Sequence, residues 1–324
     1  MQFGLLLGDV PREMDARIQL DALLRQTHAA QEAGFTLLTI GQHFLYGDVR
    51  WLQPIPTIAR LAAEVDDTVR FATTVIVAPL HEPVLLAEEL ATLDIVTGGR
   101  LTVGLGIGYR REEFRQLGVP WQQRVSRFEE MVPLLRQLWT KDEVTHVGET
   151  WQLDRARPHV QPVQQPTPPI WIGASATAGV RRSARLGDAW PIGPRLTMEQ
   201  IVPLLRLYED ERRSLGLPRA QLPIRRDIVL GASAVDARSR FTAMTAQRFA
   251  EYAARELDTL PGDSAAAAIV GTPASVCAQL HELAAQLPIG PIIVRAQWPA
   301  MDTKDVRGYL AELGREVVQP LAAA

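Results

Sequence analysis

Short apolar runs alternate along the chain with longer segments in which apolar residues recur at helical spacing. Gln2–Leu7 has the continuous apolar character of a buried strand, and Asp15–Ala33 carries a helical apolar stripe that ends at Gly34. The same alternation predicts further strands at Thr36–Gly41, Arg70–Ala78, Arg100–Gly106, Ile170–Gly173, Asp188–Ile192, Ile224–Gly231 and Pro291–Ala296. It predicts further helices at Pro56–Ala63, Pro83–Leu93, Arg124–Trp139, Thr177–Leu186, Met198–Leu215, Asp236–Glu256, Pro273–Gln286 and Thr303–Val318.

Roughly eight strand–helix units predict parallel strands joined by helical crossovers. A single α/β domain over residues 1–324, folded as a (β/α)8 TIM barrel, fits this count, and a doubly wound open sheet is the alternative. Thr140–Pro169 breaks the rhythm and is interpreted as an insertion after the fourth helix, with a hairpin around Val147–Gly148–Glu149. Leu257–Gly271 is expected to be a looser, mobile segment.

Composition and charge exclude several classes of protein. Hydrophobic residues make up 47% of the chain and the net charge is −3, which gives no global attraction to nucleic acid or to an anionic membrane. No apolar run reaches the length of a membrane span, and the N-terminus lacks a signal-peptide pattern. The single cysteine, Cys277, cannot form an internal disulfide, so we expect a cytoplasmic protein.

Chemistry in such a barrel is expected in the loops at the carboxyl ends of the strands. His43 follows the second strand, where it either transfers a proton or is a structural histidine bonded to backbone. The glycines in Gly104–Phe114 either let the backbone approach a flat or anionic ligand or form a tight turn. Gly173–Thr177 opens a helix and is either an anion site or a plain N-cap. Two such loops on one rim favour a phosphate ligand.

Other chemistries find no support in the sequence. The remaining histidines are scattered without a second ligand at helical spacing, so no metal site is predicted. Few lysines are present, and Lys141 and Lys304 occupy expected solvent positions, which disfavours a Schiff-base barrel enzyme. The tryptophans in predicted loops either wall an apolar pocket or pack against the rim; they are Trp51, Trp121, Trp151 and Trp298.

Taken together, these loops resemble the luciferase-like monooxygenase family, which includes bacterial luciferase, two-component FMN monooxygenases and enzymes that use the deazaflavin F420. The similarity spans nearly the whole chain and is strongest in Arg100–Trp139. It places His43 at the flavin-facing histidine, although Gln42 stands where the family usually has an acidic residue. It also places a non-proline cis peptide at Thr74–Val75, beneath the flavin ring.

The resemblance assigns the cofactor to the same loops. The implied cofactor-binding residues are Thr74, Val75, Gly106, Gly108, Tyr109, Gly173, Ser175, Ala176 and Thr177, with the phosphate at the turn that begins near Ser175. Ile107 replaces an arginine that meets the phosphate in bacterial luciferase, so the positive charge must come from Arg110, Arg111 or elsewhere. We expect those two arginines to be solvated, given their acidic neighbours.

The resemblance implies hydride or oxygen chemistry on a reduced flavin held without a covalent bond. In the FMN branch, a separate flavin reductase supplies reduced FMN, which reacts with O2 and oxidises the substrate. In the F420 branch, the deazaflavin carries a hydride and no oxygen is used. We expect an FMN-dependent monooxygenase acting on a small apolar organic molecule. The alternatives are an F420-dependent dehydrogenase or reductase, and a non-catalytic flavin-binding protein.

The family commonly pairs into homodimers through the helices that flank the second to fourth strands. The segments Pro56–Ala63 and Pro83–Leu93 lie at these positions and are rich in leucine, namely Leu85, Leu86, Leu90 and Leu93. These residues either form a dimer interface or only cover the sheet. We expect a homodimer, with neither nucleic acid nor membrane as a partner.

Overall fold

The fold was analysed in a computed structural model of the chain. The structure describes residues 1–8, 10–11, 15–47, 49–254, 262–295, 297–298 and 303–323. The expected looser segment Leu257–Gly271 therefore lies partly outside the described residues.

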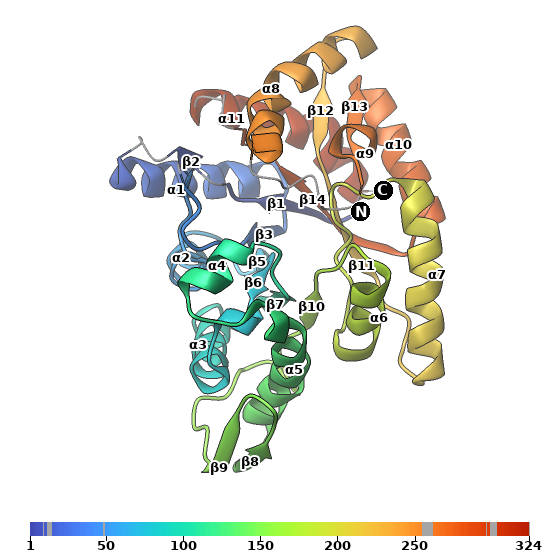
Figure 1. Ribbon diagram of the computed structural model, residues 1–324. Coiled ribbons are helices and arrows are strands. Elements are labelled where there is room, and N and C mark those ends of the chain that lie inside the picture. Colours follow the sequence, from blue (N-terminus) through green and yellow to red (C-terminus); the bar gives the residue numbers. More distant parts are fainter. Residues whose placement is uncertain are drawn as a thin grey trace.

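A parallel sheet that curls as a half-barrel forms the centre of the molecule (Figure 1). Its strands follow the order β10-β7-β5-β3-β1-β14-β11, with β6 paired to β7. Their bounds are β1 Phe3–Leu6, β3 Leu37–Ile40, β5 Arg70–Thr73, β6 Ile76–Val77, β7 Leu101–Gly106, β10 Ile170–Ile172, β11 Leu222–Arg226 and β14 Ile289–Arg295. The α/β class and parallel pairing predicted from the sequence are thus confirmed.

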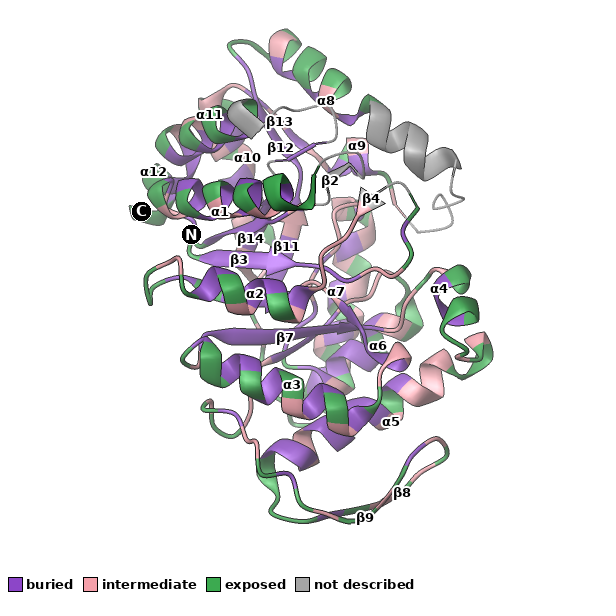
Figure 2. Ribbon diagram, turned by 90° about the vertical axis from the view of Figure 1, so that its left-hand side faces the viewer, coloured by how far each residue is buried: buried purple, intermediate pink, exposed green. Residues whose placement is uncertain are grey.

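Helices cover the convex side of this sheet. They are α1 Ala16–Glu32, α2 Pro54–Ala62, α3 Pro83–Val96, α5 Arg124–Thr140, α6 Thr177–Leu186, α7 Met198–Ser214, α8 Ala234–Ala254, α10 Pro273–Gln286 and α11 Thr303–Leu313. Most bounds agree with the sequence prediction within a few residues. The closing helix is not regular, because a π-helical turn, Gly314–Val318, separates α11 from α12, Gln319–Ala323. Figure 2 shows buried residues on the sheet and on the inward faces of these helices.

Two predictions about the carboxyl-terminal half were wrong, and a third was wrong for the described part of its segment. The expected single strand Ile224–Gly231 is two strands, β11 and β12 (Ile228–Leu230), and β12 pairs in parallel with β13 (Ile269–Gly271) outside the main sheet. Regular structure occupies the described part of the expected loose segment, where α9 (Ser264–Ala267) precedes β13. Asp188–Ile192 forms no continuous strand, but isolated parallel bridges join Ala189 to Trp171, and Ile192 to Ala174 and Ile224.

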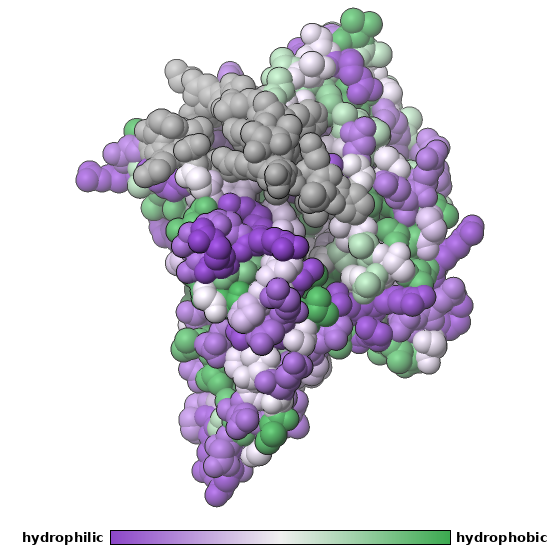
Figure 3. Space-filling view, in the orientation of Figure 1, coloured by the Kyte–Doolittle hydropathy of each residue, from purple (hydrophilic) through white to green (hydrophobic). Residues whose placement is uncertain are grey.

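A two-stranded antiparallel hairpin follows α5. Its strands are β8 (Val144–Val147) and β9 (Gln152–Ala156), which confirms the hairpin predicted around Gly148. Figure 1 shows the hairpin extending away from the sheet, and Figure 3 shows that this end is largely hydrophilic. Separately, β2 (Val10–Pro11) and β4 (Val49–Arg50) form a short antiparallel pair.

The apolar residues of α3 belong mainly to the core. Leu86, Leu90 and Leu93 are at most 2% exposed, so they cover the sheet rather than form an outer face. Leu85 is 67% exposed, and Ile95 and Val96 are also exposed near the end of the same helix. Of the four leucines considered for a dimer interface, only Leu85 is therefore exposed, and Ile95 and Val96 add to the apolar surface of this helix.

The expected strand Arg70–Ala78 is interrupted at Thr74–Val75, where the peptide bond is cis as predicted. The bend brings Thr73 and Val75 against the glycines of β7. A Cβ on Gly104 would lie 1.9 Å from the Thr73 carbonyl oxygen, and one on Gly106 would lie 2.6 Å from a Val75 methyl group. Gly104 and Gly106 are therefore required because the neighbouring strand lies too close for a side chain. The earlier interpretations, a ligand approach and a tight turn, did not include this requirement.

Gly104→Ala is expected to lower the free energy of unfolding by about 3 kcal/mol, because the new methyl group meets backbone that has no room to move. Gly308→Ala is the control, since Gly308 lies inside α11 with open space around its Cβ position. That change should stabilise the protein by roughly 0.5–1 kcal/mol. Urea unfolding measures both, and equal midpoints for the two variants would contradict this account.

Candidate functional site

A cavity of about 600 Å³ opens at the carboxyl ends of the parallel strands. It is lined by nine of the ten residues that the sequence analysis singled out: His43, Thr74, Val75, Gly106, Gly108, Tyr109, Gly173, Ser175 and Ala176. Thr177 is outside the lining and is exposed at the first turn of α6. Three separate loops therefore meet at one place, as expected for a site on a barrel rim.

Aromatic rings surround the imidazole of His43. The ring centroids of Tyr46 and Trp51 lie 4.6 Å and 4.7 Å from it, and that of Tyr109 lies at 5.6 Å. Trp51 is held in turn by a 2.7 Å hydrogen bond from its indole N–H to the Gly41 carbonyl. These contacts fix the plane of the imidazole at the cavity wall.

A carboxylate that the sequence analysis missed holds the other side of this imidazole. Glu113 lies on the short helix α4 (Arg111–Gln116), and its Oε1 is 2.9 Å from His43 Nδ1. The same oxygen accepts the Phe44 backbone N–H at 2.9 Å and Arg110 Nη1 at 3.1 Å. Gln42 therefore does not leave His43 without an acidic partner, because Glu113 supplies one from 70 residues further along the chain.

The Glu113 carboxyl is buried, with its side chain 1% exposed. Burial alone would raise its pKa, but the hydrogen bond and charge of His43, the Phe44 N–H and the Arg110 guanidinium together lower the pKa. The carboxyl is thus ionised at neutral pH and accepts hydrogen bonds. Since an ionised carboxylate cannot donate, the proton between the two groups belongs to His43 Nδ1. That leaves Nε2 facing the Tyr109 hydroxyl at 3.2 Å.

The expectation that Arg110 is solvated was wrong. Its side chain is 15% exposed, and its guanidinium lies 4.5 Å from the centre of the Tyr46 ring while it pairs with Glu113. Arg110 also donates to the Phe44 carbonyl. Arg111 is exposed, as expected, and lies over Trp121. Neither arginine is among the residues that line the cavity.

Gln42 has a structural role beside the site. Its Oε1 accepts the Val77 backbone N–H at 3.1 Å and lies 2.9 Å from His81 Nε2. Burial lowers the pKa of His81 to about 4, so this imidazole is neutral at neutral pH and donates from Nε2. The side-chain amide of Gln42 accepts both hydrogen bonds. Gln42 thereby connects the loop that carries His43 to β6, the strand that follows the cis peptide.

Two arginines that line the cavity come from α5 and α6, and the sequence analysis identified neither. The N-cap of α6 is Ala176, and no side chain caps the helix, so a plain N-cap by Ser175 or Thr177 was not the outcome. Arg124, the first residue of α5, and Arg182 of α6 both line the cavity. Arg182 pairs with Glu129 at 2.8 Å. The sequence pattern did not single out either arginine, because both lie within predicted helices.

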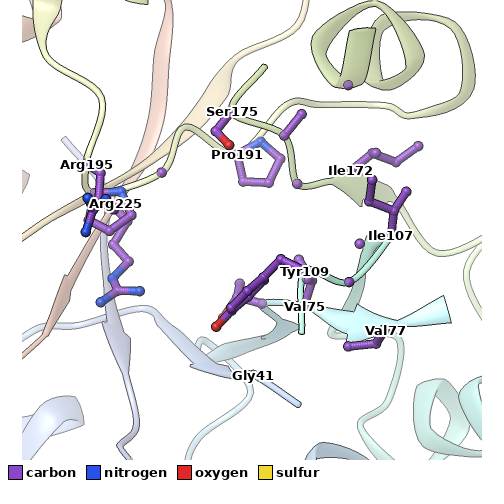
Figure 4. A pocket seen from close by; sticks show the side chains of 18 of the residues that line it. Gly41, Val75, Val77, Ile107, Tyr109, Ile172, Ser175, Pro191, Arg195 and Arg225 are labelled. Atoms are coloured by element: carbon purple, nitrogen blue, oxygen red, sulfur yellow. The ribbon is translucent and has the colours of Figure 1, made fainter. Parts of the chain in front are cut away.

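Three further arginines, Arg195, Arg225 and Arg295, also line the cavity. In Figure 4, Arg195 and Arg225 lie together on one side of the pocket, across from Ile107 and Ile172. Trp51 and Trp298 also line the cavity, whereas Trp121 and Trp151 do not. Among the described residues, no group of three or more His, Cys, Asp or Glu side chains could hold a metal ion, and no helix is long and apolar enough to cross a membrane.

Comparison with known proteins establishes the family. The family described as luciferase-like monooxygenase matches residues 1–289, and the chain belongs to it. The chain is 32% identical over 179 residues to the oxygenase component of a flavin-dependent trigonelline monooxygenase from Acinetobacter baylyi, covering 54% of this chain and 49% of that protein. It is 29% identical over 196 residues to an F420-dependent glucose-6-phosphate dehydrogenase from Nakamurella multipartita, covering 55% of each.

The chain spans about half the length of these curated relatives. Among solved structures, monooxygenase RslO1 from Streptomyces bottropensis superimposes with a TM-score of 0.86 at 24% identity, over 99% of this chain and 100% of that one. At that identity, the structural likeness establishes the fold. The relatives thus include both branches of the family, those that use FMN and those that use F420.

Glu113→Gln is expected to lower the free energy of unfolding at pH 7 by about 3 kcal/mol, because Arg110 and His43 lose a buried ionic partner. The native pKa of Glu113 is lowered, so its contribution is present above the unfolded pKa and is lost as the pH falls through the native pKa. The difference in the free energy of unfolding between the parent and Glu113→Gln should therefore become smaller as the pH falls.

The matched control for that experiment is Glu112→Gln. Glu112 is the exposed neighbour of Glu113 and pairs with Arg115 on the surface of α4, and its loss should leave the urea midpoint close to that of the parent. A Glu113 variant as stable as this control at pH 7 would contradict the role assigned to the buried carboxylate.

Proposed function

We propose that this protein is a flavin-dependent monooxygenase that uses reduced FMN, held without a covalent bond, and O2 on a small organic substrate. The observation that carries the proposal is the convergence of His43, the Thr74–Val75 peptide and the Ser175 turn on one cavity. When bound, reduced FMN supplies the electrons that activate oxygen. The chain supplies binding, orientation and a positioned proton.

The residues present fit a flavin. The ring is proposed to lie against Thr74, Val75, Gly106, Gly108 and Tyr109, all of which line the cavity. The cavity is large enough for a cofactor, and its wall is mostly apolar with a few placed polar groups, as small-molecule sites require.

The FMN phosphate is proposed to bind where α6 begins, beside Gly173, Ser175, Ala176 and Thr177. Backbone N–H groups at a helix start have no partner within the helix and favour an anion. Arg124 supports this assignment, because its Nε is buried and has no hydrogen-bond partner among the described residues. Arg124 and Arg182 then supply the positive charge that Ile107 does not.

His43 is proposed to hold or accept a proton at Nε2, next to the flavin ring. Glu113 fixes its orientation and stabilises the imidazolium that would form. Tyr46, Trp51 and Tyr109 exclude water from its faces. Together these residues position one proton-transfer group at the cavity wall.

An F420-dependent dehydrogenase or reductase is the alternative, and similarity to an F420-dependent relative supports it. In that case the same site would orient a deazaflavin for hydride transfer and would use no oxygen. A non-catalytic flavin-binding protein is the third possibility, and the buried Glu113–His43 pair argues against it, because mere binding does not require an oriented imidazole.

Two structural proposals accompany this function. The bridges of Ile192 to Ala174 and to Ile224 connect the two edges of the curled sheet, and they support a complete (β/α)8 barrel closed through residues 189–192. On that count α5 is the fourth helix of the barrel. The segment with the β8–β9 hairpin is then an insertion that follows it, within one domain over residues 1–324.

A separate flavin reductase is the proposed partner, since the relative from Acinetobacter baylyi is the oxygenase component of its system. Such a partner would deliver reduced FMN to the cavity. We propose neither nucleic acid nor membrane as a partner.

FMN should bind this chain, and Ser175→Asp should weaken binding at least about tenfold by placing a like charge at the phosphate. Arg124→Gln should weaken FMN binding by a similar factor. Riboflavin, which lacks the phosphate, should bind the parent more weakly and lose less in both variants. Flavin absorption titrations measure these affinities.

Ser233→Asp is the control for that experiment, since it adds the same charge at the start of α8, away from the cavity. It should leave FMN affinity unchanged. If Ser175→Asp also leaves FMN affinity unchanged, the phosphate lies elsewhere. A parallel titration with F420 separates the two branches, because the cofactor that binds more tightly identifies the branch.

A homodimer is proposed to form through α2 and α3, where Leu85 in the first turn of α3 and Ile95 and Val96 in its last turn are exposed. Light scattering at micromolar concentration should give twice the chain mass, and Leu85→Lys with Ile95→Lys should give monomers. Leu215→Lys, an exposed leucine after α7, should leave the dimer intact. A monomeric parent would refute the interface.

A further inference from the structure

We propose that Tyr109 is the catalytic residue that exchanges a proton with the bound ligand, and that His43 acts through the Tyr109 hydroxyl rather than by touching the ligand itself. This inference rests on the proposed function, which places the flavin ring against Tyr109. It deepens that function, because it names the group that meets the reacting atoms and gives the Glu113–His43 pair a path to them.

Both nitrogens of the His43 imidazole are held by one segment, the loop and short helix that follow β7. Glu113 Oε1 lies 2.9 Å from Nδ1, and the Tyr109 hydroxyl oxygen lies 3.2 Å from Nε2. The His43 and Tyr109 rings meet edge to face, with an angle of 81° between their planes. The His43 side chain is only 12% exposed. The atoms that could transfer a proton are thus fixed in one line from Glu113 to Tyr109.

The ionised carboxylate of Glu113 sets the direction of both hydrogen bonds. Because a carboxylate only accepts, Nδ1 carries the proton of the neutral imidazole, and Nε2 is an acceptor. The Tyr109 hydroxyl therefore donates its proton to Nε2. Nε2 has a single lone pair, which that bond uses, so a ligand cannot bond to Nε2 while Tyr109 is in place. A hydroxyl oxygen accepts as well as donates, so the ligand meets the Tyr109 oxygen instead.

The turn at Gly108 brings Tyr109 to this position. Gly108 has a φ of +76°, and a Cβ there would lie 2.7 Å from Phe114 and from Val77, so only glycine fits. Tyr109 lines the cavity and is 42% exposed. Figure 4 shows its side chain extending into the pocket. Tyr109 is thus open to a ligand, whereas the Glu113 side chain is 1% exposed.

The step moves two protons and creates no charge on Tyr109. A ligand N–H or O–H bond breaks and leaves its electron pair on the ligand, and the released proton forms a new O–H bond at the Tyr109 oxygen. The original hydroxyl proton passes to His43 Nε2 and makes the imidazolium. The Glu113 carboxylate, 2.9 Å from Nδ1, stabilises that positive charge. The reverse sequence returns the proton to the product.

Nitrogen NMR of the chain labelled at its histidine ring nitrogens tests the hydrogen bond without any cofactor, and His43→Gln identifies the signals of His43. Tyr109→Phe keeps the aromatic ring and removes only the hydroxyl. The Nε2 resonance should therefore shift from that of a hydrogen-bonded acceptor toward that of a nitrogen without a donor. Tyr208→Phe is the matched control, because Tyr208 is buried on α7 and is not among the residues that line the cavity. It should leave the resonance unchanged.

Oxidation of bound, reduced FMN by O2 in the absence of substrate tests the proton path. Two electrons pass to O2, H2O2 forms, and a ring N–H proton must leave the flavin, while stopped-flow absorption follows the return of oxidised FMN with the chain in excess. Tyr109→Phe and His43→Gln should each slow this reaction by about 10²-fold, because each removes one part of the same path. Tyr208→Phe should keep the parent rate.

The double variant, Tyr109→Phe with His43→Gln, should be no slower than the slower single variant, because residues that act as a unit are not additive. Flavin absorption titrations should give Tyr109→Phe an FMN affinity close to that of the parent, since the ring that contacts the cofactor remains. A slower reaction in this variant then reports proton transfer rather than lost binding.

An Nε2 resonance that is the same in the parent and in Tyr109→Phe would overturn the proposal. With FMN bound, a Tyr109→Phe reaction as fast as that of the parent would also overturn it and leave the proposed function standing, because His43 would then act on the ligand directly. Single effects that multiply in the double variant would contradict a shared path. If FMN does not bind the parent, the proposed function fails, and the NMR measurement still decides whether Tyr109 is the partner of His43.

Discussion

The buried carboxylate of Glu113 is the constraint on which the site depends. A single oxygen at the centre of three contacts connects the loop after β3, the loop after β7 and helix α4. An ionised carboxylate tolerates burial only when such donors surround it. Because the partners must stay in place, the carboxylate also fixes the orientation of His43. Chemistry and local stability are therefore coupled at one residue.

Charged side chains line the cavity at several places. Arg124 of α5 and Arg182 of α6 are among the lining residues, as are arginines from β11, β14 and the loop before α7. The Thr74–Val75 peptide and the His43 imidazole line the same cavity. A cofactor bound there would lie beside an imidazole whose orientation Glu113 fixes.

Hydrophobic periodicity predicted most of this fold, since helices such as α6 and α10 need only a regular apolar face. It failed where tertiary contacts decide, as at β12 and β13, which pair outside the main sheet. The loops of the site were also predictable, because rim loops follow the strands. Glu113 was not, because its polar neighbours made α4 look like a solvated surface and nothing local shows which carboxylate turns inward. The arginines of the cavity likewise depend on which face of a helix or strand meets the rim.

The most direct test of the account is a crystal structure of the chain with bound FMN. The account predicts the ring against Val75 beside His43, with the phosphate at Ser175 between Arg124 and Arg182. A phosphate bound instead by Arg195, Arg225 and Arg295 would contradict the account.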